Sequence, residues 1–261
     1  MQRALQPNDR MHDVLSKVPQ VTLMFWVVKV LATTVGETGG DALSMTLKLG
    51  YAAASLVFVG LFVITLSAQL ASRRYHPAAY WAVVVATTTV GTTVSDYLDR
   101  TVGLGYVKSS AMLLAGVIVV LLLWRWTTGR LEFENIRTRR EEFFYWLTIL
   151  VSNTLGTALG DFVATTTGLG FENGALVFAA LLALVAAAHF WSRKIPPSLL
   201  FWAAYVLTRP LGATLGDTLT KSHPEGGLAL GRIQSSLVIA AAMTIAIFAM
   251  AASRRGRKQA Q

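Results

Sequence analysis

Apolar residues follow one another along this chain in eight long segments, which short polar stretches separate. The segments span 21–45, 51–71, 79–99, 105–126, 143–165, 172–191, 199–219 and 229–252. Each is close to the roughly 20 residues that an α-helix needs to cross the hydrocarbon core of a bilayer. The pattern predicts an all-α integral membrane protein with eight transmembrane helices, in a membrane domain over residues 21–252.

One motif recurs in every second segment. It begins with Trp, has Gly ten residues later, a small residue fourteen later and Asp fifteen later. Its four copies occupy 26–41, 81–96, 146–161 and 202–217. Four ungapped matches at fixed offsets identify an internal repeat. The sequence therefore predicts four two-helix repeats that cross the membrane in the same direction. Their expected ranges are 21–71, 79–126, 143–191 and 199–252.

The two ends of the chain are polar. Residues 1–20 contain Pro7 and Pro19 and lack the apolar stretch of a cleaved signal peptide, so we expect a cytosolic N-terminal arm. Residues 253–261 form a basic tail. Lys and Arg gather in these two ends and in the loops on the same side, which by the positive-inside rule places both termini in the cytosol.

Composition supports a membrane protein and explains the net charge. Hydrophobic residues make up 54% of the chain and charged residues 14%, against about 25% charged in soluble domains. The net charge of +9 follows from the topology and favours contact with anionic lipid headgroups, so we expect no nucleic-acid partner. The chain has no cysteine, which excludes disulfides and thiolate metal sites. Five basic residues are expected as loop charges on the outer side: Lys48, Arg100, Lys108, Lys221 and Arg232.

The small residues of the motif predict where the helices pack. Offsets ten and fourteen share one helix face, and small side chains let helix backbones approach closely in a membrane. The four pairs are Gly36 and Gly40, Gly91 and Ser95, Gly156 and Gly160, and Gly212 and Gly216. The tryptophans stand at the cytosolic helix ends, where they predict an interfacial belt.

Polar residues form a second stripe on each motif helix. Offsets seven, eleven and fifteen fall on one face, because successive residues are about 100° apart. The stripes are Thr33, Glu37 and Asp41; Thr88, Thr92 and Asp96; Asn153, Thr157 and Asp161; and Arg209, Ala213 and Asp217. A carboxylate inside a membrane is costly and faces a partner or a wet cavity. We therefore expect Asp41, Asp96, Asp161, Asp217 and Glu37 to share one central site.

Two bases lie at similar depth, and the local sequence is unusual for a helix. Lys29 and Arg209 are expected at the edge of the acidic cluster, where the excess negative charge would be relieved by protons or a bound metal cation. The Thr- and Gly-rich stretch 33–40 is a poor helix former, and Pro210 follows Arg209. These features predict that the motif helices break near the acids, as discontinuous transporter helices do.

The pattern K-xx-ATT-x-GE-xxx-D, here from Lys29 to Asp41, resembles a bacterial family of multi-helix membrane proteins described as uncharacterised and membrane-anchored. The stretches ATTTVGTTVSD, SNTLGTALGD and TRPLGATLGD of the later repeats are similar to the same pattern. The resemblance covers nearly the whole chain apart from its ends and the middle loop. It implies four repeats in a multi-pass protein of a bacterial inner membrane, and it supplies no activity.

Two functions fit these residues. All-oxygen donors without sulfur suit a hard cation, so the first is a secondary transporter or channel, with export of Mn²⁺ or Mg²⁺, coupled to protons, as the specific hypothesis. The cation would be substrate, and no cofactor is expected. The second is a scaffold or sensor whose acids and bases form a structural network, for example Arg209 with Asp41 or Lys29 with Asp217. An enzyme is not expected, since no His base accompanies the Thr hydroxyls. Homo-oligomerisation is left open.

Overall fold

The structure is a computed structural model, and it describes residues 18–72, 75–131, 136, 138–191 and 194–259. Within these residues the fold is all-helical, as predicted, with eight α-helices. The helices are α2 (Leu23–Asp41), α3 (Tyr51–Ala71), α4 (Pro77–Asp96), α5 (Tyr106–Thr128), α6 (Arg139–Asp161), α7 (Gly170–Trp191), α8 (Pro197–Thr220) and α9 (Arg232–Gln259). Most of the expected N-terminal arm and the loop charges Arg73, Arg74, Arg137 and Arg193 lie outside the described residues.

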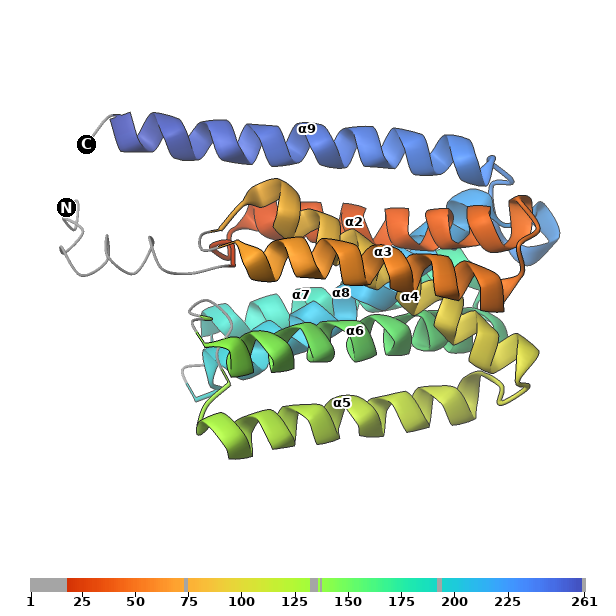
Figure 1. Ribbon diagram of the computed structural model, residues 1–261. Helices are drawn as coiled ribbons and strands as arrows, with labels where there is room; N and C mark the ends of the chain where they lie inside the picture. Colours follow the sequence, from red (N-terminus) through yellow and green to blue (C-terminus); the bar gives the residue numbers. More distant parts are fainter. Residues whose placement is uncertain (1–17, 73–74, 132–135, 137, 192–193, 260–261) are drawn as a thin grey trace.

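The four motif helices run in one direction and the other four return. Helix α2 begins and α9 ends at the same end of the bundle (Figure 1). Three of the four hairpins turn on a glycine with positive φ: Gly50 at 76°, Gly105 at 73° and Gly170 at 77°. These are the glycines of a recurring Leu-Gly-aromatic triplet. The repeats are therefore parallel, as the sequence predicted.

The motif helices form a closed ring at the centre of the protein. Helix α2 contacts α4 and α8, and α6 contacts the same two helices. Each of the other helices packs mainly on the motif helix of the next repeat: α3 on α4, α5 on α6, and α7 on α8. Helix α9 packs on α2 and so joins the last repeat to the first. The ring thus has pseudo-fourfold order, and each repeat covers its neighbour.

The outer helices present an apolar surface. Large side chains on them are well exposed, for example Leu56 at 75%, Leu122 at 62% and Leu184 at 65%. Among the described residues, the helices that are long and apolar enough to cross a membrane number five: α3, α5, α7, the span Arg139–Thr166 and the span Arg232–Ala252. The motif helices α2, α4 and α8 carry Thr and Gly instead, and these face the interior. An apolar exterior around a polar ring is typical of a membrane protein.

The motif glycines bring neighbouring ring helices into backbone contact. A Cβ on Gly91 would lie 2.8 Å from the carbonyl carbon of Asn153, closer than a Cβ can stand. The same relation recurs around the ring, because each offset-ten glycine faces the offset-seven residue of the next repeat. The pairs are Gly36 with Thr88, Gly91 with Asn153, Gly156 with Arg209, and Gly212 with Thr33. At offset fourteen, Gly40 faces Thr92, Gly160 faces Ala213 and Gly216 faces Glu37, while the buried Ser95 donates to Asp99.

Substituting leucine for Gly156 should break this ring. A Cβ there would already overlap the Arg209 side chain, so the larger side chain must push α6 and α8 apart. We expect Gly156→Leu to lower the melting temperature in detergent strongly or to prevent folding. Gly60→Leu is the matched control, since Gly60 lies on the outer face of α3 with no atom within 4 Å of its Cβ position. Equal melting of both variants would contradict the close-approach assignment.

Two expectations about the motif helices were wrong. Helix α2 continues unbroken through its Thr- and Gly-rich stretch, and α8 continues through Pro210. The first three motif helices instead pass into a π-helical turn directly after the aspartate, at η1 (Ala42–Thr46), η2 (Tyr97–Thr101) and η3 (Phe162–Thr166). Packing in the ring overrides the weak local propensity, and the irregular backbone follows the acids rather than preceding them.

Candidate cation site

Aromatic side chains close the ring at the end where the motif helices begin. Trp81, Trp146 and Trp202 are buried there, and only Trp26 is partly exposed, so the predicted interfacial belt was wrong. The residue before each tryptophan is also aromatic and buried: Phe25, Tyr80, Tyr145 and Phe201. Tyr80 and Tyr145 share a hydrogen bond of 2.7 Å between their hydroxyls. We call these eight residues the aromatic plug; it separates the polar interior from that end of the bundle.

Lys29 lies beside the plug and not among the acids. Its side chain is fully buried, with Nζ 3.4 Å from Asn153 Oδ1 and 4.2 Å from the centre of the Tyr205 ring. Asn153 in turn donates to Thr87. No carboxylate lies within ion-pair distance of Lys29 in the part of the chain that the structure describes. Lys29 therefore does not pair with Asp217, the example considered for a structural network, and does not stand at the edge of the acidic cluster as expected.

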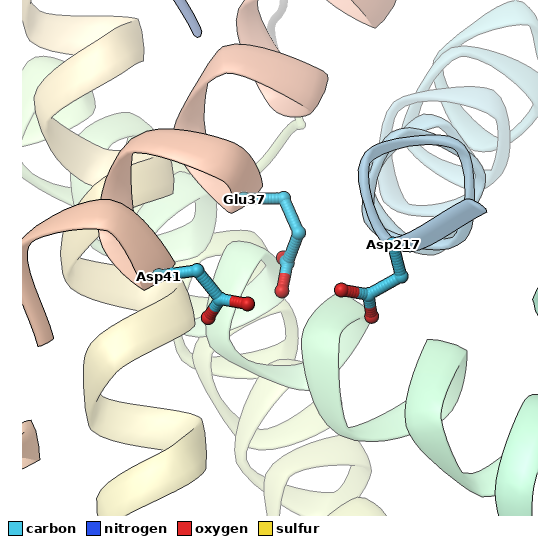
Figure 2. A group of neighbouring side chains, drawn as sticks. All are labelled: Glu37, Asp41 and Asp217. Atoms are coloured by element: carbon cyan, nitrogen blue, oxygen red, sulfur yellow. The ribbon is translucent and has the colours of Figure 1, made fainter. Parts of the chain in front are cut away.

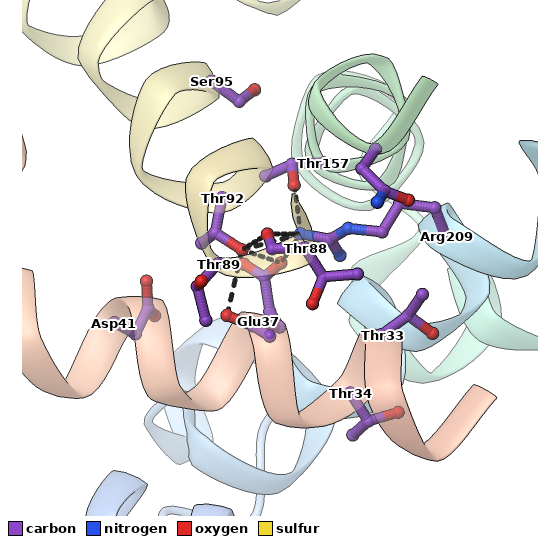
Figure 3. A network of polar contacts seen from close by, with 12 residues as sticks. Thr33, Thr34, Glu37, Asp41, Thr88, Thr89, Thr92, Ser95, Thr157 and Arg209 are labelled. Atoms are coloured by element: carbon purple, nitrogen blue, oxygen red, sulfur yellow. Dashed lines mark hydrogen bonds and ion pairs between the residues drawn. The ribbon is translucent and has the colours of Figure 1, made fainter. Parts of the chain in front are cut away.

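Arg209 crosses the centre of the ring and ties three other motif helices to α8. Its Nη2 lies 3.0 Å from Glu37 Oε2, and 2.6 Å from the hydroxyls of both Thr92 and Thr157 (Figure 3). Arg209 is fully buried and Glu37 is 3% exposed. The partner of Arg209 is thus Glu37, and not Asp41, the other example considered for a structural network.

The four motif aspartates stand one helical turn beyond the offset of Glu37. Arg100 and Lys221 each contact two of them. Arg100 reaches Asp96 at 3.1 Å and Asp161 at 3.5 Å. Lys221 Nζ lies 3.1 Å from Asp217 and 3.1 Å from Asp41. In each pair the base bonds the aspartate of its own repeat and that of the next one. The site therefore has two related halves, one held by arginine and one by lysine.

The lysine half carries a third carboxylate. Glu37, Asp41 and Asp217 point toward one another from α2 and α8 (Figure 2), and each offers an oxygen within 4.8 Å of the others. All three are buried. The position that corresponds to Glu37 in the arginine half is Thr157. Carboxylate oxygens at this spacing can surround a hard cation, whose ligands lie at about 2.0–2.6 Å from it.

A pocket opens beside the lysine half, at the end opposite the plug. It has a volume of about 440 Å³, and Thr220, Ser222, Glu225 and Arg232 are among the residues that line it. Arg232 Nε reaches Asp41 Oδ2 at 3.5 Å, so one wall of the pocket touches the acids. The Ser222 hydroxyl and backbone N–H both donate to Glu225. These hydrogen bonds lower the pKa of Glu225 and keep it ionised.

The three bases Arg100, Lys221 and Arg232 were expected to be loop charges and are instead partners of the acids. The sequence carries a signal for two of these bases. Arg100 lies four residues after Asp96, and Lys221 lies four residues after Asp217, so each base meets its acid on one helix face. With Arg209, four bases lie within ion-pair distance of the five acids, while Lys29 lies apart beside the plug. With all of these groups ionised, the cluster has a formal charge of −1, compared with −3 for five acids against two bases.

A family model described as "Repeat of Unknown Function (DUF347)" matches this chain four times, at residues 24–75, 79–130, 144–194 and 200–256. Each match contains one motif helix and the helix that follows it. Searches of the curated proteins and of the solved structures found no match.

Proposed function

The chain belongs to this repeat family, and from the site itself we propose that it is a secondary transporter or channel for a hard cation. The observation that carries the proposal is the convergence of Glu37, Asp41 and Asp217 inside an apolar helical bundle. Burying three carboxylates is costly, and glycine packing alone could hold the ring. The specific substrate we propose is Mn²⁺ or Mg²⁺, exported in exchange for protons.

The donor set supports a hard ion. All three candidate ligands are carboxylates, and neither sulfur nor imidazole belongs to the group. Mn²⁺, Mg²⁺ and Ca²⁺ prefer such oxygen ligands, whereas Zn²⁺ and Cu⁺ favour nitrogen or sulfur. The chain carries no nucleotide-binding motif, so the energy would come from the proton gradient or the membrane potential.

The proposed setting is a bacterial inner membrane with both termini in the cytosol. The basic residues of the chain ends and of the loops on that side support this orientation, and they would contact anionic headgroups. The aromatic plug then lies on the cytosolic side, and the pocket beside Arg232 opens to the outside. This arrangement corresponds to a transporter closed toward the cytosol.

A structural role for the network is the second candidate, and one observation favours it. Each of the five acids lies within ion-pair distance of a base. A scaffold or sensor built on these ties would need no cation. The two candidates differ in whether cells depend on the protein when an ion is in excess.

Growth on a panel of divalent ions separates the two. Cells that lack the protein should become sensitive to one hard ion, with Mn²⁺ the expected one, because export would keep its cytosolic concentration low. Wild-type protein and Glu172→Gln should restore growth, since Glu172 is exposed, whereas Asp217→Asn should not. Normal growth of the deleted cells on Mn²⁺, Mg²⁺ and Ca²⁺ alike would favour the scaffold.

A further inference from the structure

The position that a cation would take is held by the chain's own lysine. Lys221 Nζ stands 3.1 Å from Asp41 Oδ2 and 3.1 Å from Asp217 Oδ1, and its side chain is only 6% exposed. A primary ammonium between two carboxylates has the charge and the contacts of a bound cation. A metal ion held by the same oxygens and by Glu37 could not share this space with it.

The site keeps an oxygen for a further ligand. Asp41 Oδ1 is buried and accepts no hydrogen bond from any residue that the structure describes. An unpartnered buried carboxylate oxygen is costly, and a metal ion bound by both oxygens of Asp41 would satisfy it. The lysine therefore fills the site only in part.

In the arginine half, the base contacts its two acids in a different way. Arg100 bonds Asp96 through Nε and Asp161 through Nη2, so its planar guanidinium spans both acids. Lys221 contacts its two acids through a single nitrogen atom, and only this half adds Glu37. The lysine half thus has a base that bonds through one atom, together with a third carboxylate. The arginine half has a base that bonds through two atoms and no third carboxylate.

The pocket beside the end of α8 offers the Lys221 side chain a second position. Lys221 caps the C-terminus of α8 directly after Thr220, and its backbone is extended. The loop that follows lines the 440 Å³ pocket with Ser222 and Glu225. Glu225 is an exposed carboxylate four residues after Lys221, in the loop that lines this pocket, so it offers a second acid to the ammonium once that group leaves Asp41 and Asp217.

We propose that Lys221 is a tethered competitor for the cation, which a divalent ion displaces from Asp41 and Asp217 toward Glu225. The inference rests on the proposed function and adds its regulation: the empty site is neutralised by the protein itself. Occupation by lysine reduces the fraction of molecules that are ready to bind. The apparent affinity for the ion is then lower than the intrinsic one by that fraction.

Removing the ammonium should therefore tighten metal binding. We expect purified Lys221→Met to bind Mn²⁺ at least about tenfold more tightly than wild type, measured by titration calorimetry in detergent. Lys108→Met is the matched control, since Lys108 is an exposed lysine at the same end of the bundle, and it should bind as wild type does. Equal or weaker binding by a folded Lys221→Met would overturn the proposal.

A second measurement needs no variant. Lys221 in wild-type protein should react slowly with an amine-acetylating reagent, and added Mn²⁺ should raise its labelling several-fold while Lys108 stays unchanged, as read by mass spectrometry. Labelling of Lys221 that Mn²⁺ leaves unchanged would reject displacement. These assays report binding alone, so tight binding by Lys221→Met without any flux through wild type would support the competitor and reject the transporter.

Discussion

Replacing Arg209 with methionine is expected to destabilise the protein by about 3–5 kcal/mol, the range for breaking a buried ion pair on one side. Arg209 is fully buried, and its Nη2 atom lies 3.0 Å from Glu37 and 2.6 Å from the hydroxyls of Thr92 and Thr157. Without the guanidinium, Glu37 would keep a charge at the centre of the ring with no base to compensate it.

A second substitution, at Glu37, tests whether Arg209 and Glu37 neutralise each other. Glu37→Gln in the Arg209→Met background removes the stranded charge, so the double variant should recover a large part of the lost stability. Chemical unfolding in detergent gives the four free energies of the cycle. Arg140→Met is the control, because an exposed charge contributes about 0–1 kcal/mol. A double variant no more stable than Arg209→Met would show that Glu37 is not the residue that Arg209 neutralises.

The main outline of the fold follows from the sequence, because bilayer thickness fixes the length of each apolar run. The fixed offset between the glycines and the aspartates also places the packing face and the polar stripe on every motif helix. What the sequence could not give is which outer helix covers which repeat. Helix α3 packs on α4, and α9 on α2, and an apolar helix fits either neighbour equally well by composition.

The tryptophans show a different limit. An amphipathic ring at a helix end suits both an interfacial belt and a buried cluster. The aromatic residue before each tryptophan favours a buried cluster over an interfacial belt, because it places two adjacent rings at the same end of every motif helix. Phe25, Tyr80, Tyr145 and Phe201 are all buried, and aromatic ring contacts join each motif helix to its neighbours.

The acids were identified from the sequence, but their partners were not. Arg100 and Lys221 follow the apolar runs and were assigned to loops by the length of the spans. Arg100 lies within η2, which continues α4, and Lys221 caps the C-terminus of α8. Hydropathy marks where a helix becomes polar, and it does not show whether that polar side chain turns back toward the axis.

Cation flux through purified protein tests the central claim most directly. In proteoliposomes with a fluorescent Mn²⁺ indicator, the wild type should carry Mn²⁺, and Asp217→Asn should reduce the initial rate by at least about tenfold. Asp217 supplies one of three carboxylates in the group, and an amide there removes a ligand charge. Glu172→Gln should keep the wild-type rate. Equal Mn²⁺ flux through wild type and a folded Asp217→Asn, or no flux through wild type with Mn²⁺, Mg²⁺ or Ca²⁺, would contradict the account.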